Sequence, residues 1–115
     1  MESILTSVKK LLGIAEEYEH FDADIIMHIN SVFMILSQLG VGPNNGYMIT
    51  GKSNTWSEYI PSDSKMFEPV KSYIFMKVKL LFDPPASSAV TEAYNRMISE
   101  FEWRLQTEAE SNTTT

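Results

Sequence analysis

Apolar residues recur at helical spacing in four stretches of the chain, and each stretch predicts one α-helix. The expected helices cover residues 3–12, 22–39, 64–82 and 87–105. Turn residues follow the first three of them, at Gly13, at Gly40 and at Pro84–Pro85, and Asp22 is expected to cap the second. Because strands and helices do not alternate, the sequence predicts an all-α fold that resembles a four-helix bundle.

The second stretch is apolar on more than one side of its expected helix. Its main stripe contains Ile25, Ile29, Val32, Phe33, Leu36 and Leu39. Further apolar residues lie off that stripe: Ile26, Met27, Met34 and Ile35. A helix of this kind is buried on more than one side. It is therefore either the central core helix or a helix whose spare face packs on a partner subunit.

Two segments break the helical pattern. The loop at residues 41–64 is rich in turn residues, and residues 47–50 within it are expected to form a short strand, as in a short β-hairpin, with a helical turn at residues 56–60. Connections in compact domains are usually shorter, so this loop is expected to be functional or mobile. Residues 107–115 are polar and are expected to form a disordered tail, which leaves a domain at residues 1–106.

Part of the loop, GYMITGKS at residues 46–53, matches the nucleotide-binding pattern G-x-x-x-x-G-K-[ST]. A working P-loop follows a buried strand and contains the start of a helix, so that free backbone N–H groups face the phosphates. Here a helix and the turn VGPNN come first, and Pro61 follows soon after. The sequence therefore predicts a turn-forming loop rather than a nucleotide site.

The composition offers no other site for catalysis or for a metal. The chain contains no cysteine, and its two histidines, His20 and His28, are too few to hold a metal without several nearby carboxylates. No apolar run is long enough to span a membrane, and the first residues do not have the pattern of a signal peptide. We therefore expect an intracellular, non-enzymatic protein with no cofactor, metal or membrane contact.

Charge is distributed unevenly along the chain, whose net charge is −6. Residues 12–49 contain five acidic residues and no Lys or Arg, whereas residues 50–82 contain five lysines and three acidic residues. An acidic protein is unsuited to wrapping DNA tightly. Segregated charge instead favours contacts between complementary surfaces, in copies of this chain or in another protein.

One ordered set of motifs extends over most of the chain. Its C-terminal part contains FDPP at residues 82–85, a capped helix and EFEWRL at residues 100–105. Its N-terminal part contains a short helix ending in LLGI, an acidic link and DADIIMHINSVFMILSQLGVGP. The set resembles the small head–tail connector proteins of long-tailed bacteriophages, also called adaptor or head-completion proteins. The resemblance covers the chain up to about residue 106, except the loop at residues 44–63.

The resemblance implies an all-helical structural protein without catalytic residues or cofactors. It implies a ring of about a dozen copies beneath the portal protein, closed by head-to-tail contacts. Such a ring would extend the channel through which DNA passes and would join the portal to the next neck or tail-completion protein. The protein would be part of the virion neck, assembled in the cytoplasm of the bacterial host.

Opposite charges suggest which residues join neighbouring copies of such a ring. We expect Lys71, Lys77 and Lys79 of one copy to meet Asp22 and Asp24 of the next. The spare apolar face of the second helix is expected to lie in the same contact.

Two tryptophans are candidate contact anchors, since Trp and Arg often dominate protein interfaces. We expect the portal contact around Trp103 and Arg104 and in the tail beyond them. Trp56, with Lys52, is expected to face either the DNA channel or the next neck protein. The alternative for each tryptophan is a partly buried place in the core.

A function of a different class also fits the pattern, namely a small helical regulatory or interaction module that acts as a dimer. A DNA-reading helix-turn-helix needs a second helix with Arg, Asn or Gln facing the bases. Here the tight turn FDPPASS leads into a helix that is acidic outside Arg96 and Arg104. The pattern disfavours DNA reading and leaves dimer formation open.

Overall fold

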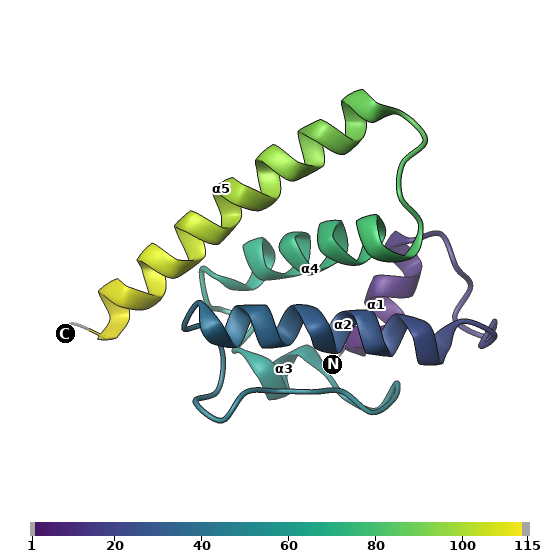
Figure 1. The fold of residues 1–115 in the computed structure, drawn as a ribbon. Coiled ribbons are helices and arrows are strands. Elements are labelled where there is room, and N and C mark those ends of the chain that lie inside the picture. The colour runs from purple at the N-terminus through teal and green to yellow at the C-terminus, as the bar shows by residue number, and fades with distance from the viewer. Residues whose placement is uncertain (1, 114–115) are drawn as a thin grey trace.

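A computed structural model describes residues 2–113, and five helices form within that range (Figure 1). They are α1 (Ile4–Leu11), α2 (Asp22–Gln38), α3 (Trp56–Tyr59), α4 (Phe67–Phe82) and α5 (Ser88–Thr113). No strand occurs in the described residues, where an isolated bridge pairs Ser3 with Thr55. The predicted all-α fold is confirmed, and the four longer helices begin close to the positions that their apolar stripes indicated.

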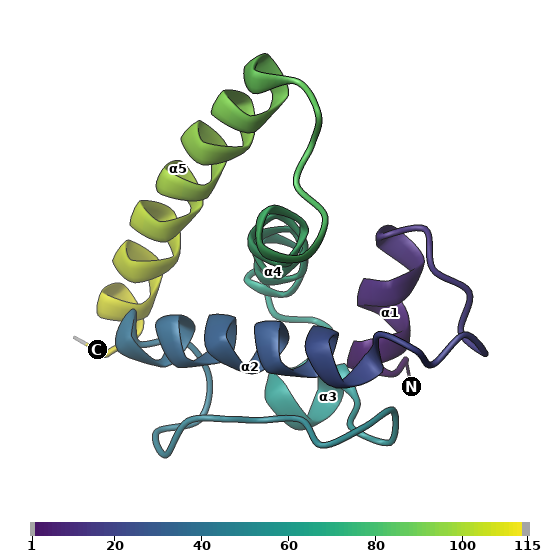
Figure 2. The same cartoon turned by 45° about the vertical axis from the view of Figure 1, so that its right-hand side comes forward.

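The central helix of the fold is α4. Figure 2 shows it almost end-on, with α1 on one side, α5 on the other and α2 beneath it. Its buried residues are Val70, Tyr73, Ile74, Met76 and Val78. The predicted stripe of α2 packs against it, with Ile25, Ile29, Val32, Phe33 and Leu36 all buried. Each of these α2 side chains contributes roughly 1.5–3 kcal/mol by leaving water, so the α2–α4 contact is a major source of stability.

The start of α2 differs from the prediction. Phe21 occupies the capping position, and no side chain caps the helix. The carboxylate of Asp22, which was expected to do so, lies 2.8 Å from Nζ of the buried Lys9. A buried ammonium requires an anionic partner, because removing a charge from water costs several kcal/mol, whereas a missing cap costs about 1 kcal/mol.

The loop before α4 contains no β-hairpin, contrary to the prediction for residues 47–50. A side chain takes the place of a partner strand. Asn30 of α2 donates from Nδ2 to the carbonyl of Ile49 at 3.0 Å, and its Oδ1 accepts from the N–H of Ile49 at 2.8 Å. Ile49 thereby enters the core with both backbone polar groups satisfied. The predicted helical turn is present as α3.

Helix α5 continues through residues 107–113, which the sequence predicted to be a disordered tail. Its buried residues Ile98, Leu105 and Ala109 keep helical spacing across the expected boundary. Ala109 packs against the end of α2, where a Cβ added to Gly40 would lie only 3.2 Å from it. The polarity of residues 107–113 indicated disorder, but this segment also contains Ala and Glu, which are strong helix formers. Residues 114 and 115, the end of the expected tail, lie outside the described residues.

The attachment of α5 to the core is uneven along its length. Figures 1 and 2 show α5 diverging from α4 toward the turn that contains Pro84 and Pro85. Val90, in the diverging half, is exposed, whereas Leu105 and Ala109 are buried. The divergence leaves apolar surface of α4 and α5 uncovered.

Candidate interaction surfaces

Hydrogen bonds to side chains hold residues 46–53, the segment that matched the nucleotide-binding pattern, in place. The N–H groups of Thr50 and Gly51 both donate to Oδ1 of Asn54, at 2.8 and 3.4 Å, and the N–H of Ile49 donates to Asn30. No helix begins within residues 46–53, so these amides do not converge on a ligand. The segment is a loop held by two asparagines, as the surrounding sequence predicted.

Asn30→Ala is expected to destabilise the protein by about 2 kcal/mol, because the buried N–H and C=O of Ile49 would lose their partners. Asn30→Asp keeps the acceptor for the N–H of Ile49 but sets a carboxylate oxygen against its carbonyl oxygen, so a loss of similar size, about 2 kcal/mol, is expected at neutral pH. Urea unfolding followed by circular dichroism measures both changes. If N30A were as stable as the natural protein, Asn30 would not be the anchor of the loop.

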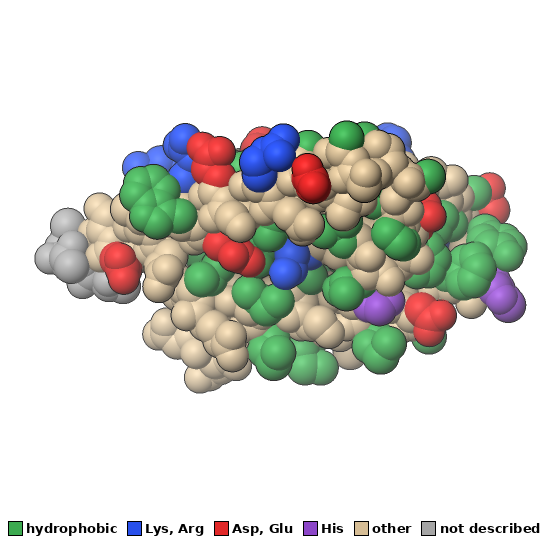
Figure 3. All heavy atoms as spheres, turned by 45° about the horizontal axis from the view of Figure 1, so that its top comes forward, with side chains coloured by type: hydrophobic (Ala, Val, Ile, Leu, Met, Phe, Trp, Pro, Cys, Tyr) green, Lys and Arg blue, Asp and Glu red, His purple; other side chains and the backbone are tan. Residues whose placement is uncertain are grey.

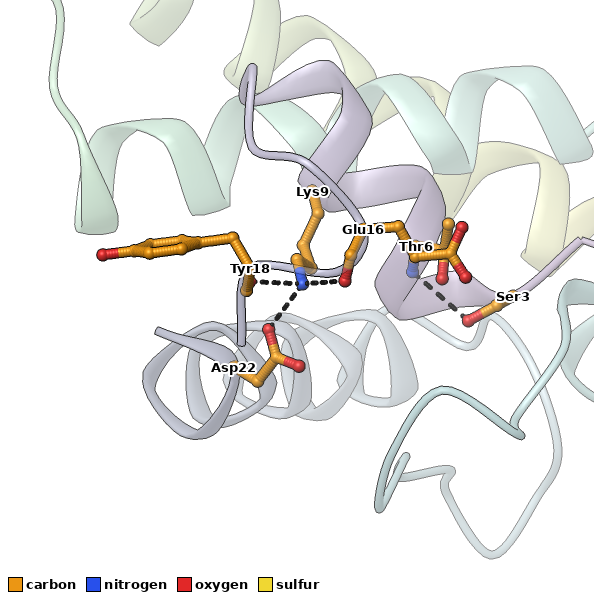
Figure 4. A network of polar contacts seen from close by, with 6 residues as sticks. All are labelled: Ser3, Thr6, Lys9, Glu16, Tyr18 and Asp22. Carbon is orange, nitrogen blue, oxygen red and sulfur yellow. Dashed lines mark hydrogen bonds and ion pairs between the residues drawn. The ribbon is translucent and has the colours of Figure 1, made fainter. Parts of the chain in front are cut away.

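Lys9 fastens the acidic link that joins α1 to α2 (Figure 4). Its side chain is 2 % exposed, and its Nζ donates to the carbonyl oxygens of Glu16 at 2.9 Å and Tyr18 at 2.8 Å. The same atom pairs with the carboxylate of Asp22 at 2.8 Å. Three acceptors, from the link and from the first turn of α2, thus surround one buried ammonium.

The three lysines expected at a subunit contact do not share one face of α4. Lys77 and Lys79 follow Lys71 by six and eight residues, which rotates them by about 240° and 80° around the helix axis. Two of the three also have partners in the same chain. Nζ of Lys79 lies 2.9 Å from Asp83, and that of Lys71 lies 3.6 Å from Glu2. The three lysines are therefore separate and two of them are partly neutralised, and their contact with another copy stays a prediction.

The acidic side of that expected contact is also smaller than predicted. Asp22 is partly buried and paired with Lys9, so a contact with another copy would have to break an internal ion pair. Asp24, two residues later in α2, is exposed. Asp24 is therefore the more accessible of the two acidic residues, and their contact with another copy stays a prediction.

The two tryptophans have opposite environments. Trp103 is 66 % exposed on α5, beside the exposed Arg104. Trp56 is 2 % exposed, and its Nε1 donates to Oγ of Ser7 at 2.9 Å. Trp103 is available to a partner, whereas Trp56 is a core residue, and the predicted loop contact is corrected accordingly. Lys52, the other residue of that predicted contact, is exposed.

An apolar surface lies on the outer side of α2. Three methionines there are 58–66 % exposed, namely Met27 and Met34 of α2 and Met48 of the loop. With Ile26 and Tyr47 they line an open hollow of about 700 Å³, and we call these five residues the methionine face. Of the four apolar residues off the main stripe of α2, Met27 and Met34 are exposed, whereas Ile26 and Ile35 are partly buried, and the contact of this face with a partner stays a prediction. Met48 was not predicted; it is exposed although the next residue, Ile49, is buried.

On the side of the molecule in Figure 3, basic and apolar side chains lie mostly apart, whereas Asp and Glu side chains lie among both. Figure 3 shows hydrophobic side chains exposed across the middle and lower part of one side of the molecule, whereas most Lys and Arg side chains in view lie along the upper edge. Contiguous apolar surface on a small protein usually marks contact with another macromolecule.

A second apolar surface is a groove over α4, with α1 and α5 as its walls. We call it the α4 groove; its volume is about 410 Å³, and its apolar lining includes Leu11, Phe75, Tyr94, Met97 and Phe101. The groove is open because the first half of α5 diverges from α4. It was not predicted, because its residues come from three helices whose relative placement no local pattern reveals.

One polar contact ties α5 to α4. The hydroxyl of Tyr73, a fully buried residue of α4, donates to Oε2 of Glu102 at 2.7 Å. Burial, together with this carboxylate, raises the pKa of Tyr73, so the hydroxyl keeps its proton and remains the donor at neutral pH. Glu102 adjoins Trp103 in the sequence, so the bond fixes the part of α5 that presents the exposed tryptophan.

Within residues 2–113, no group of three or more His, Cys, Asp or Glu side chains is placed to hold a metal ion. Over the same range, no helix combines the length and the apolar content that crossing a membrane requires.

The chain is similar to one family of known proteins. A family model described as phage connector protein matches residues 4–112. No curated protein and no solved structure matches the chain. The family match covers α1 to α4 and all of α5 except its last residue, Thr113. It therefore extends past residue 106, where the sequence predicted the domain to end.

Proposed function

The chain belongs to the phage connector protein family, and from this we propose that it is a structural neck protein that joins the capsid of a bacteriophage to its tail. The family match over residues 4–112 is the observation that carries the proposal. The copies form a ring of about a dozen subunits beneath the portal protein, closed by head-to-tail contacts. The ring extends the DNA channel and receives the next neck or tail-completion protein.

A closed ring needs two different contact surfaces on every subunit. The methionine face and the α4 groove meet this need, because both are apolar and they lie on different elements. Of the residues that charge suggested for this contact, Asp24 is exposed near the start of α2, and Lys71 lies in the lining of the groove.

Trp103 and Arg104 form the proposed portal contact. Trp and Arg are enriched at the energetic centres of protein interfaces. Trp103 has a large apolar area that a partner would bury, and the Tyr73–Glu102 bond already holds this part of the helix in place. Docking at Trp103 therefore requires little ordering, which reduces the entropic cost of binding.

The proposal assigns no catalysis, cofactor or membrane contact to the protein. Its net charge of −6 suits the wall of a channel, because an acidic surface does not retain DNA that passes through. Lys52, exposed in the loop, is the candidate for contact with the channel or with the next neck protein. The protein acts in the neck of the virion after assembly in the cytoplasm of the bacterial host.

Light scattering after size exclusion, with and without the portal protein, tests this proposal. We expect a ring-sized species, or a monomer that joins the portal in about a dozen copies. Trp103→Ala is expected to weaken portal binding about thirtyfold, since an interface anchor contributes ~2 kcal/mol or more. Arg96→Ala, at an exposed position of the same helix, is the control and should bind as the natural protein does.

Two results would contradict different parts of the proposal. A stable dimer that does not bind the portal would exclude the connector ring and favour a regulatory or interaction module. Ring assembly together with unchanged portal binding by W103A would exclude only the assigned portal contact.

A further inference from the structure

We infer that neighbouring copies of the chain join by packing the methionine face of one copy into the α4 groove of the next. This inference rests on the proposed function, because it assigns the contact surfaces of the ring. It replaces the contact that charge alone suggested, since Asp22, Lys71 and Lys79 are engaged within their own chain.

The two surfaces are complementary in chemistry. The groove is lined by the aromatic rings of Phe75, Tyr94 and Phe101, and the methionine face presents three exposed thioether side chains. Sulfur–aromatic contacts are favourable, and the unbranched methionine side chain adapts to the shape of a partner. Each surface also leaves apolar area in water that the other would bury.

The charges that border the two surfaces differ, because carboxylates border the methionine face whereas the groove carries both signs. Two carboxylates border the methionine face: Asp24 lies in the first turn of α2, and Glu58 accepts a hydrogen bond from the tyrosine of that face. In the groove, Lys71 lies in the lining together with Glu68 and pairs with Glu2, and Lys10 is exposed on α1, which forms one wall. The surrounding sequence extends this contrast, because residues 12–51 contain five acidic residues and no Lys or Arg.

The same charges favour contact between different surfaces of two copies. Two methionine faces related by a twofold axis would bring their bordering carboxylates together, and like charges across an interface are unfavourable. A face packed into a groove instead leaves one surface open on each end copy. The contact therefore repeats from copy to copy, and the proposed ring forms if the rotation between neighbouring copies closes.

Site-directed cross-linking between introduced cysteines tests the pairing. The natural chain contains no cysteine, so no other thiol of this chain can react. Met27→Cys places a thiol on the methionine face, and Met97→Cys places one in the groove. In assemblies confirmed by light scattering, with the portal protein present if assembly requires it, a short bismaleimide should join the two variants when they are mixed. Neither variant alone should give a product, nor should M27C mixed with the exposed control Ser62→Cys.

The outcomes separate this inference from the function on which it rests. Assembly without a mixed product would overturn the pairing and leave the ring in place. A product from M27C alone would show contact between two methionine faces and would overturn it as well. If no variant and no natural protein assembled, even with the portal, the proposed function would fall, and the pairing with it. Loss of assembly in folded M27C or M97C, with S62C still assembling, would support the pairing.

Discussion

Lys9→Met is expected to lower the free energy of unfolding by about 3 kcal/mol, out of the roughly 5–15 kcal/mol that is typical of a folded domain. Methionine is similar in length, so the loss comes mainly from the polar groups left behind. The carboxylate of Asp22 and the carbonyls of Glu16 and Tyr18 would all lose the ammonium group that lies within 2.9 Å of each. Breaking a buried ion pair costs roughly 3–5 kcal/mol, and the lower end applies because Asp22 is partly exposed.

Urea unfolding at neutral pH measures this effect. Lys10→Met changes the neighbouring, exposed lysine of α1 and should alter stability by less than about 0.5 kcal/mol. The double variant K9M/D22N should lose less than K9M, because Asp22 no longer contributes an uncompensated charge. If K9M were as stable as K10M, the network in Figure 4 would make no net contribution to folding.

Trp56→Ala is expected to destabilise the protein by about 3–5 kcal/mol, the usual range for removing a large aromatic side chain from a core. The indole packs against Phe67 with ring centres 6.0 Å apart, and its Nε1–H binds the hydroxyl of Ser7. Trp56→Phe keeps much of the packing and loses the hydrogen bond. A smaller loss of about 1–2 kcal/mol is therefore expected.

The matched control for this prediction is the other tryptophan. Trp103→Ala should change the free energy of unfolding by less than about 0.5 kcal/mol, because the side chain is mostly in solvent. Thermal and urea unfolding of W56A, W56F and W103A give the order directly. A result in which W103A is the least stable of the three would contradict the assignment of Trp56 to the core and Trp103 to a contact surface.

The helices were predictable because their burial follows a local period. In α2, the spacing of Ile25, Ile29, Val32 and Leu36 marks one face of a helix, and the structure buries all four. The spare face at Met27 and Met34 was visible for the same reason, since apolar residues off the main stripe have no place in the same interface. A pattern within one element thus identifies both the face that is buried and the face that is left over.

Lys9 shows what such a pattern does not contain. In the sequence it is one of two adjacent lysines near the end of α1, yet Lys9 is buried and Lys10 is exposed. The difference arises because the chain turns back over α1 and places the carbonyls of Glu16 and Tyr18 around one ammonium group. The two tryptophans differ for a comparable reason, since only the fold brings Ser7 to the indole of Trp56.

The end of α5 illustrates a related limit. Its polar composition suggested disorder, but a few long-range contacts order it. Ala109 packs beside Gly40, and the carboxylate of Glu108 pairs with Lys65 at 2.6 Å. The composition of a segment shows how much apolar surface that segment itself can bury. It does not show which residues elsewhere in the chain, such as Gly40 and Lys65 here, contact the segment in the fold.

The uneven attachment of α5 determines how a mechanical load on it is carried. Trp103 lies on the attached half of the helix, next to Glu102 and two residues before the buried Leu105. Tension applied by a partner bound at Trp103 would therefore pass through the neighbouring Glu102 and its hydrogen bond with Tyr73 into α4. The diverging half of α5, which the turn at Pro84–Pro85 joins to α4, lies outside this path, so the load does not act to peel the helix away from that end.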